Sequence, residues 1–260
     1  MTVSASHTKP YSKTAIVAPI GTSPPVITAG IDAIDEHISD LVLLATQDEQ
    51  VLAGCDLVRL GLQLRYPHVR IHEAYLPFDD ITNDDENLKF MAIAARVIKE
   101  ERDEYHCDRI LLNVAGGRKN MCITLALLGQ ILNVDNVFHI VNHEVKLFNQ
   151  NLERMRPTMM QLFRADSPDE KRQIYLDNQE MFDLVLFPPK HEYDLIRIPT
   201  LPYPTSLIST LLSRVVFDPY MLSEEDCTLL LRHGILERQG NNLYISDYGA
   251  KFLDVLVGKG

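Results

Sequence analysis

The chain has 260 residues, of which 46% are hydrophobic and 23% charged, as is typical of a globular protein of roughly one to two domains. Its formal net charge of -11 argues against a protein that wraps a long nucleic acid, because phosphates demand a basic surface. Cys55, Cys107, Cys122 and Cys227 lack CxxC spacing, so the sequence predicts no zinc site and no disulfide framework and favours the cytoplasm. Residues 1–13 read as a flexible tail without a signal peptide, and no segment is apolar enough for a membrane span.

The first unit of the chain is a strand, a short loop and a helix. Residues 14–20 form an apolar strand, and Gly21 and Thr22 begin the loop. Ser23 is predicted to be the N-cap of the helix, with Pro24 at its first position. The serine therefore has two interpretations, a helix cap or a ligand contact.

Strands and helices then alternate with short connections. Strands are predicted at residues 40–46, 69–76, 109–114 and 136–141, and helices at residues 50–64, 84–104 and 119–128. This order predicts an α/β fold, a Rossmann-like, mostly parallel, doubly wound sheet. Four acidic residues lie before or at the start of the helix predicted at residues 84–104: Asp79, Asp80, Asp84 and Asp85. They are explained as helix N-terminal acids rather than as a metal site.

The loop before the third of these helices has the composition of an anion site. Gly116 and Gly117 permit a tight turn, and Arg118 and Lys119 open a helix whose N-terminus offers unpaired N–H groups. Because the carboxyl ends of parallel strands meet at one edge of a sheet, we expect this loop to converge with residues 21–23. The sequence therefore predicts a binding site for a small phosphate ligand.

The next segment is charged and helical. Residues 144–180 are predicted to be helical with breaks at Pro157 and at Ser167-Pro168, and residues 182–187 to return as a strand. Lys190, after that strand, is a candidate second cation over the ligand. His143, after the strand at residues 136–141, has two interpretations, an acid or base that reaches the ligand or a structural residue.

A cluster of prolines between residues 188 and 204 marks a domain edge, which divides the chain into residues 14–203 and 204–260. The second part is predicted to be a winged helix from these elements: a helix at residues 207–216, a helix capped by Ser223, a hairpin at residues 234–246 and a helix from Asp247. Residues 219–260 hold four basic and six acidic residues, and this net charge of -2 argues against DNA binding.

Together, the two loops carry a family resemblance. Gly21-Thr22-Ser23-Pro24 after the first strand and Gly116-Gly117-Arg118-Lys119 after the fourth resemble the CARF domain family of CRISPR defence. More narrowly, the second loop resembles that of the CRISPR-associated ring nucleases with a GGRK-type motif. By architecture, the resemblance covers about the first two thirds of the chain.

The resemblance implies a homodimer that holds a cyclic oligoadenylate, most often cyclic tetra-adenylate, across its two-fold axis. No effector nuclease motif is visible, so we expect ring cleavage in the CARF site, by attack of a ribose 2′-OH on the adjacent phosphorus, with no metal ion and no cofactor. The candidate catalytic residues are Ser23, Arg118 and Lys119. The candidate ligand-binding residues are Gly21, Thr22, Pro24, Gly116, Gly117, Asn120, Met121 and His143, with the N–H groups of Asn120 and Met121 assisting at the phosphate.

Two other functions stay open. One is a sensor without catalysis, a CARF and winged-helix transcription regulator, which would need a basic recognition helix. The other is a dinucleotide enzyme, which would need G-x-G-x-x-G after the first strand, and the sequence after Gly21 lacks its second and third glycines.

Overall fold

The computed structural model describes residues 12–200, 207, 222–240 and 242–250. The chain divides into two compact units, residues 1–200 and 201–260, and each is described by itself. Most of the predicted N-terminal tail, and the helix predicted at residues 207–216 apart from Leu207, lie outside the described residues. No helix in the described part of the chain is long and apolar enough to cross a membrane.

A six-stranded sheet forms the centre of the first unit, in the order β3-β2-β1-β4-β5-β6. Its strands are β1 (Thr14–Pro19), β2 (Ile38–Ala45), β3 (Arg70–Tyr75), β4 (Arg109–Asn113), β5 (Asn136–Asn142) and β6 (Tyr193–Ile198). All neighbouring pairs are parallel except β5 and β6. The prediction of a Rossmann-like, mostly parallel sheet is confirmed. The central strand β1 is buried along its whole length, as expected of a strand covered on both faces.

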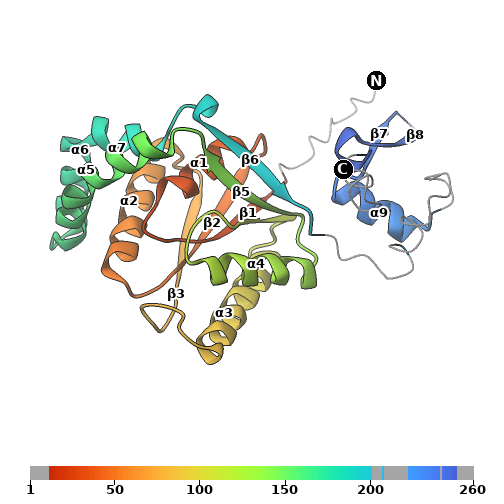
Figure 1. Cartoon of the computed structure of the whole chain (residues 1–260), viewed down its shortest axis with the longest axis horizontal. Helices are drawn as coiled ribbons and strands as arrows, with labels where there is room; N and C mark the ends of the chain where they lie inside the picture. The colour runs from red at the N-terminus through yellow and green to blue at the C-terminus, as the bar shows by residue number, and fades with distance from the viewer. Residues whose placement is uncertain (1–11, 201–206, 208–221, 241, 251–260) are drawn as a thin grey trace, which may run out of the picture. The chain divides into compact units, whose positions relative to one another are not determined.

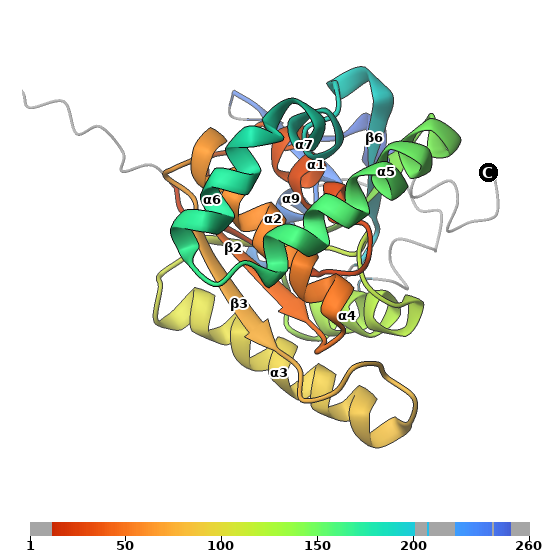
Figure 2. The same cartoon turned by 90° about the vertical axis from the view of Figure 1, so that its left-hand side faces the viewer.

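Helices cover both faces of the sheet (Figures 1 and 2). One core cluster includes residues of α1 (Pro25–Ala33), α2 (Glu49–Arg65), α5 (Val145–Arg164), α6 (Pro168–Asp177) and α7 (Gln179–Leu186). The other includes residues of α3 (Asp84–Asp103) and α4 (Lys119–Ile131). The helices that follow β1 and β4, the two central strands, therefore lie on opposite faces.

The strand predicted at residues 182–187 is wrong, because these residues lie mostly in α7. Phe182, Val185 and Leu186 are buried while Leu184 is 63% exposed, a helical spacing that a short apolar run does not reveal by itself. The sixth strand comes later, at β6, and runs antiparallel to β5. Lys190 consequently precedes the sixth strand instead of following it.

The break predicted at Pro157 is also wrong, because α5 continues through this residue. The proline leaves one carbonyl without its helical N–H partner. Burial of Leu152, Met155, Met159 and Leu162 in the core shared with α2 compensates for this loss.

The second unit has a small core of Leu207, Leu230, Ile235 and Leu236. Ser223 caps α9 (Glu224–Arg232) by accepting a hydrogen bond from the N–H of Asp226, as predicted. The predicted hairpin is formed by the antiparallel strands β7 (Leu236–Gln239) and β8 (Asn242–Ile245), and residues 247–250 are helical.

Candidate functional site

The two glycine loops meet at the centre of the sheet. β1 and β4 are neighbours, and the chain leaves them toward opposite edges, through β2 on one side and β5 on the other. Such a reversal opens a crevice at the carboxyl ends of the strands. The loops touch there, because a Cβ atom on Gly21 would lie 2.9 Å from the backbone nitrogen of Gly117. The convergence expected from the sequence is therefore present.

Two features fix the second loop in place. Gly117 has a φ of +79°, in the left-handed region that favours glycine, and packs against Pro19. The thiol of Cys122, in the first turn of α4, donates to the carbonyl of Gly116 at 3.0 Å. The backbone of this loop is thus held between β1 and α4.

Asn113, the last residue of β4, links the first turn of α1 to the loop before α4, and it is not among the predicted site residues. It is fully buried; its Nδ2 donates to the carbonyl of Val26 in α1 at 2.9 Å, and its Oδ1 accepts from the N–H of Ala115 at 3.0 Å. In the sequence, the signal for this role is a polar residue at the end of an apolar run.

The two cations at the start of α4 differ in their surroundings. Arg118 pairs with Asp80 through two contacts, Nε to Oδ1 at 2.9 Å and a terminal nitrogen to Oδ2 at 2.7 Å. Lys119 is exposed, and among the described residues no carboxylate pairs with its ammonium group. Asp80 is therefore a partner of the site and not only an acid near the start of α3. Asp84 and Asp85 do lie in the first turn of α3, as predicted.

The N–H groups at the start of α4 are not all free. The N–H of Met121 donates to Oδ1 of Asn120 at 3.0 Å, so its predicted use by a ligand requires the Asn120 side chain to move. Arg118 is the N-cap residue, and its side chain makes no capping hydrogen bond.

The prediction that Ser23 caps α1 is wrong. The helix begins at Pro25, Pro24 occupies the N-cap position with helical dihedral angles, and no side chain caps this end. The pair of prolines moves the helix start one residue beyond the predicted position, because Pro25, which has no N–H to be satisfied, suits the first turn. Ser23 is half-buried and lies just outside the helix.

A pocket of about 190 Å³ opens beside the joined loops. Five predicted site residues line it: Gly21, Thr22, Gly117, Arg118 and Met121. The rest of the pocket lining comes from five residues outside the predicted site: Ile20, Thr46, Asp48, Val51 and Asp79. The other predicted residues are not part of its lining: Ser23, Pro24, Gly116, Lys119, Asn120 and His143.

Thr46 and Asp48 could have been found from the sequence, because they follow β2 at the same edge of the sheet. Asp48 also caps α2 by accepting hydrogen bonds from the N–H groups of Gln50 and Val51. The pocket therefore has apolar side chains, hydroxyl groups and carboxylates close to the anion loop.

His143 has a separate set of partners. Its Nε2 lies 2.8 Å from Oδ2 of Asp194, and its Nδ1 lies 3.2 Å from the carbonyl of His191. The hydrogen bond to Asp194 raises the pKa of His143 above its usual value. Lys190 lies 3.9 Å from Asp35 and lines a different pocket, so neither residue borders the joined loops.

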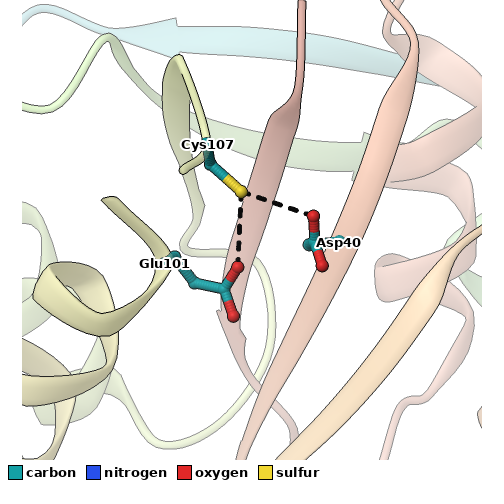
Figure 3. Close-up of side chains that lie close together, drawn as sticks. All are labelled: Asp40, Glu101 and Cys107. Atoms are coloured by element: carbon teal, nitrogen blue, oxygen red, sulfur yellow. Dashed lines mark hydrogen bonds between the residues drawn. The ribbon is translucent and has the colours of Figure 1, made fainter. Parts of the chain in front are cut away.

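A second polar cluster lies at the amino ends of the strands, and Figure 3 shows its three buried members. The thiol of Cys107, just before β4, lies 3.3 Å from Oδ2 of Asp40 in β2 and 3.4 Å from Oε2 of Glu101 in α3. Arg70 pairs with both carboxylates. Burial and the nearby charge of Asp40 raise the pKa of Glu101. Burial opposes ionisation of Asp40 too, but hydrogen bonds from Ser39 and Arg70 outweigh it and lower the pKa of that carboxyl.

Comparison with solved structures finds distant likenesses. They include Enterococcus italicus Csm6 bound to cyclic hexa-2′-fluoro-hexa-dAMP (15% identity, 94% of this chain, 53% of that chain, TM-score 0.49). Others are Can2 from Sulfobacillus thermosulfidooxidans in complex with cyclic tetra-adenylate (14% identity, 93% and 63%, TM-score 0.35) and protein VC1899 from Vibrio cholerae (8% identity, 94% and 65%, TM-score 0.41). The chain thus spans less than two thirds of the length of each. No curated protein gives a significant match.

Family comparison is more informative. Residues 205–258 match the family described as CARF-associated HTH, in agreement with the predicted C-terminal module. Residues 23–220, well over half of the chain, match the family described as CRISPR-associated protein NE0113. The resemblance to CRISPR-associated CARF proteins is confirmed, and the chain belongs to the CRISPR-associated NE0113 family.

Proposed function

We propose that the domain at residues 14–203 binds a cyclic oligoadenylate, preferably cyclic tetra-adenylate, and cleaves it as a ring nuclease of type III CRISPR defence. The observation that carries this proposal is the contact between the two glycine loops at the N-terminus of α4, beside the exposed Lys119. Free N–H groups, the helix dipole and an uncommitted cation together favour a phosphate. Membership of a CRISPR-associated family supports the ligand class that the loops resemble.

The neighbouring pocket suits one adenine of such a ring. Ile20, Val51 and Met121 offer apolar surface to a base, and the carboxylates of Asp48 and Asp79 can accept from its exocyclic amine. Its volume of about 190 Å³ is below the ~300–1,000 Å³ of pockets that enclose a whole drug-sized ligand. A cyclic tetranucleotide must therefore extend beyond this pocket.

A homodimer would supply the rest of the binding surface. Ile123, Leu127 and Ile131 form an apolar stripe on α4 and are 62%, 56% and 67% exposed. Their spacing places them on one face of the helix that begins at Lys119. A second copy that packs on this stripe across a two-fold axis would bring its own glycine loops near the first pair. Ile123→Glu combined with Leu127→Glu should give a monomer in sedimentation, whereas an unchanged dimer contradicts this interface.

The proposed cleavage uses the nucleophile that RNA carries. The ribose 2′-OH attacks the adjacent phosphorus and loses its proton, the bond from phosphorus to the 5′ oxygen breaks, and that oxygen takes up a proton. The products are a 2′,3′-cyclic phosphate and a 5′-OH. Lys119 and Arg118 stabilise the added charge on the phosphorane, and Ser23 positions the attacking ribose.

Product analysis after incubation with cyclic tetra-adenylate tests the proposal. The assay is run with EDTA and with Mg²⁺, and thermal unfolding is recorded under both conditions so that loss of folding is not mistaken for loss of chemistry. Linear products that end in a cyclic phosphate, formed in both, are the expected result. An intact ring in both would overturn the assignment of a ring nuclease.

Lys119→Ala should reduce cleavage about 100-fold or more and weaken binding, because one donor to a developing oxyanion contributes about that much. The matched control is Lys99→Ala, since Lys99 is an exposed lysine on α3, and it should cleave at the wild-type rate. Equal rates for Lys119→Ala and the wild type would refute the assigned role.

The second candidate function is a sensor without catalysis, favoured by the CARF-associated HTH match at residues 205–258. In that case the ring binds tightly, stays intact and changes the affinity of the protein for a partner of the C-terminal module. A DNA-binding measurement with and without the ring distinguishes the two functions, because a ring nuclease needs no such change.

A further inference from the structure

We propose that Asp40, His72, Glu101 and Cys107 form a binding site for a zinc-like divalent cation, separate from the two-loop site. The site would stabilise the amino end of the sheet. It draws on β2, β3, α3 and the connection that leads into β4. This inference does not depend on the proposed function.

Three of the four side chains are close enough to share one ion, and the fourth, His72, lies beside them. The ligand atoms of Asp40, Glu101 and Cys107 all lie within 4.8 Å of one another, and the thiol is 3.3 Å and 3.4 Å from the two carboxylates. Nε2 of His72 is 4.0 Å from an oxygen of each carboxylate. Bonds of about 2.0–2.3 Å to a tetrahedral zinc ion place neighbouring ligand atoms about 3.3–3.8 Å apart. Small rotations of the side chains would bring His72 into range.

Nε2 of His72 has no other partner to account for its position. This atom is buried from solvent, and no hydrogen-bond partner for it exists in the described part of the chain. At 4.0 Å the two carboxylates are too far away for hydrogen bonds. A buried polar atom without a partner costs free energy, and a metal ion between it and the carboxylates would remove that cost.

The charges of the cluster also leave room for a cation. Asp40 and Glu101 are each 2% exposed, and Arg70 is the positive group that contacts both. The side chain of Arg70 is 38% exposed and lies over the ring of Tyr105, so it approaches the carboxylates from the solvent side. When a divalent ion binds, the thiol of Cys107 releases its proton to solvent and a sulfur–metal bond forms. The thiolate, two carboxylates, Arg70 and the ion then have no net charge.

The donor set selects the class of metal. Thiolate and imidazole ligands favour zinc and related transition ions, while magnesium and calcium prefer oxygen ligands only. The cysteine spacing gave no hint of the site, because its ligands lie on segments that are distant in the sequence and contribute one residue each.

Metal titration of the full chain tests this inference. After treatment with chelator and its removal, one equivalent of Zn²⁺ should bind per chain, and one equivalent of Co²⁺ should give the near-ultraviolet absorption of a cobalt–thiolate bond. Cys107→Ser should abolish that absorption, whereas Cys227→Ser, in the second unit, should keep it. The proposal is overturned if no absorption develops, or if it survives in Cys107→Ser.

Two further variants guard against a folding defect in Cys107→Ser. His72→Ala changes a side chain that is 28% exposed and should weaken zinc binding about tenfold or more, because one of four ligands is lost. Arg70→Gln removes the competing cation and should strengthen zinc binding. Unchanged affinity in both variants would identify the cluster as an ion-pair network without metal.

Discussion

The two ends of the central sheet differ in the chemical groups that form them. At the carboxyl end, backbone groups of two glycine loops touch, and the cations beside them lie at the surface. At the amino end, carboxylates are buried and face an arginine and a thiol. At the carboxyl end, glycines without side chains leave the backbone accessible to a ligand. At the amino end, charged side chains hold neighbouring segments together. Ligand binding should therefore depend on the carboxyl end, and thermal stability on both.

Gly117→Ala should have the largest effect on the carboxyl end. The backbone φ of +79° is strained for any residue with a side chain, and a Cβ atom at this position collides with Pro19. Together these effects should lower the free energy of unfolding by about 2–4 kcal/mol and weaken ligand binding. Gly240→Ala is the control, since Gly240 has a φ of +61° with nothing within 4 Å and should cost only about 1 kcal/mol. Thermal unfolding and ligand titration of both variants measure the difference, and equal effects would show that the packing of Gly117 against Pro19 is unimportant.

Arg70→Gln tests the amino end in the absence of metal. It leaves Asp40 and Glu101 buried without their cation and should lower the free energy of unfolding by about 1–3 kcal/mol. This is less than for a fully buried pair because the Arg70 side chain is 38% exposed. Arg96→Gln breaks an exposed pair on α3 and should change stability by less than about 0.5 kcal/mol. Chemical denaturation measures both, and cleavage by Arg70→Gln should be unchanged if the two ends are independent.

Asp80→Ala sharpens the description of the carboxyl end. It frees Arg118 from its ion pair and should strengthen the binding of cyclic tetra-adenylate a few-fold, with a steeper dependence on salt. Asp84→Ala, in the first turn of α3, serves as the control for charge alone. Weaker binding in Asp80→Ala would mean that the ion pair positions Arg118 for the ligand.

The smallest effect is expected at the edge of the sheet. Asp194→Asn removes the hydrogen bond that raises the pKa of His143, so this pKa should fall toward its usual value in NMR titration. The interaction stabilises the fold below the usual histidine pKa and is lost as pH rises through the raised value. Cleavage by Asp194→Asn at the wild-type rate would support a structural role for His143. A changed dependence of the cleavage rate on pH would instead support His143 as an acid or base that reaches the ligand.

Most of the fold could be predicted from the sequence because its elements are long and periodic. The parallel strands and α2, α3 and α4 follow the predicted ranges closely, since one apolar pattern determines each. α7 was mistaken for a strand because its apolar run is short. Pro157 was mistaken for a break because its cost is offset by burial of the rest of α5, which local rules do not include.

The site could be predicted only where its parts are contiguous. The glycine loops are short motifs that follow strands, so both could be read directly. The pairing of Arg118 with Asp80 and the approach of His72 to Glu101 join residues that are distant in the sequence. Such contacts are set by the packing of β3, α3 and α4, and a single sequence does not encode them in any local pattern.

Asn113 gives the carboxyl end a mechanical property. Its one side chain holds the first turn of α1 and the loop that leads into α4, and these helices lie on opposite faces of the sheet. A movement of the first turn of α1, or of the loop that leads into α4, therefore strains a hydrogen bond of this amide. If the proposed ring binds beside the glycine loops, a shift of either segment would be transmitted to both helical layers through this single buried side chain.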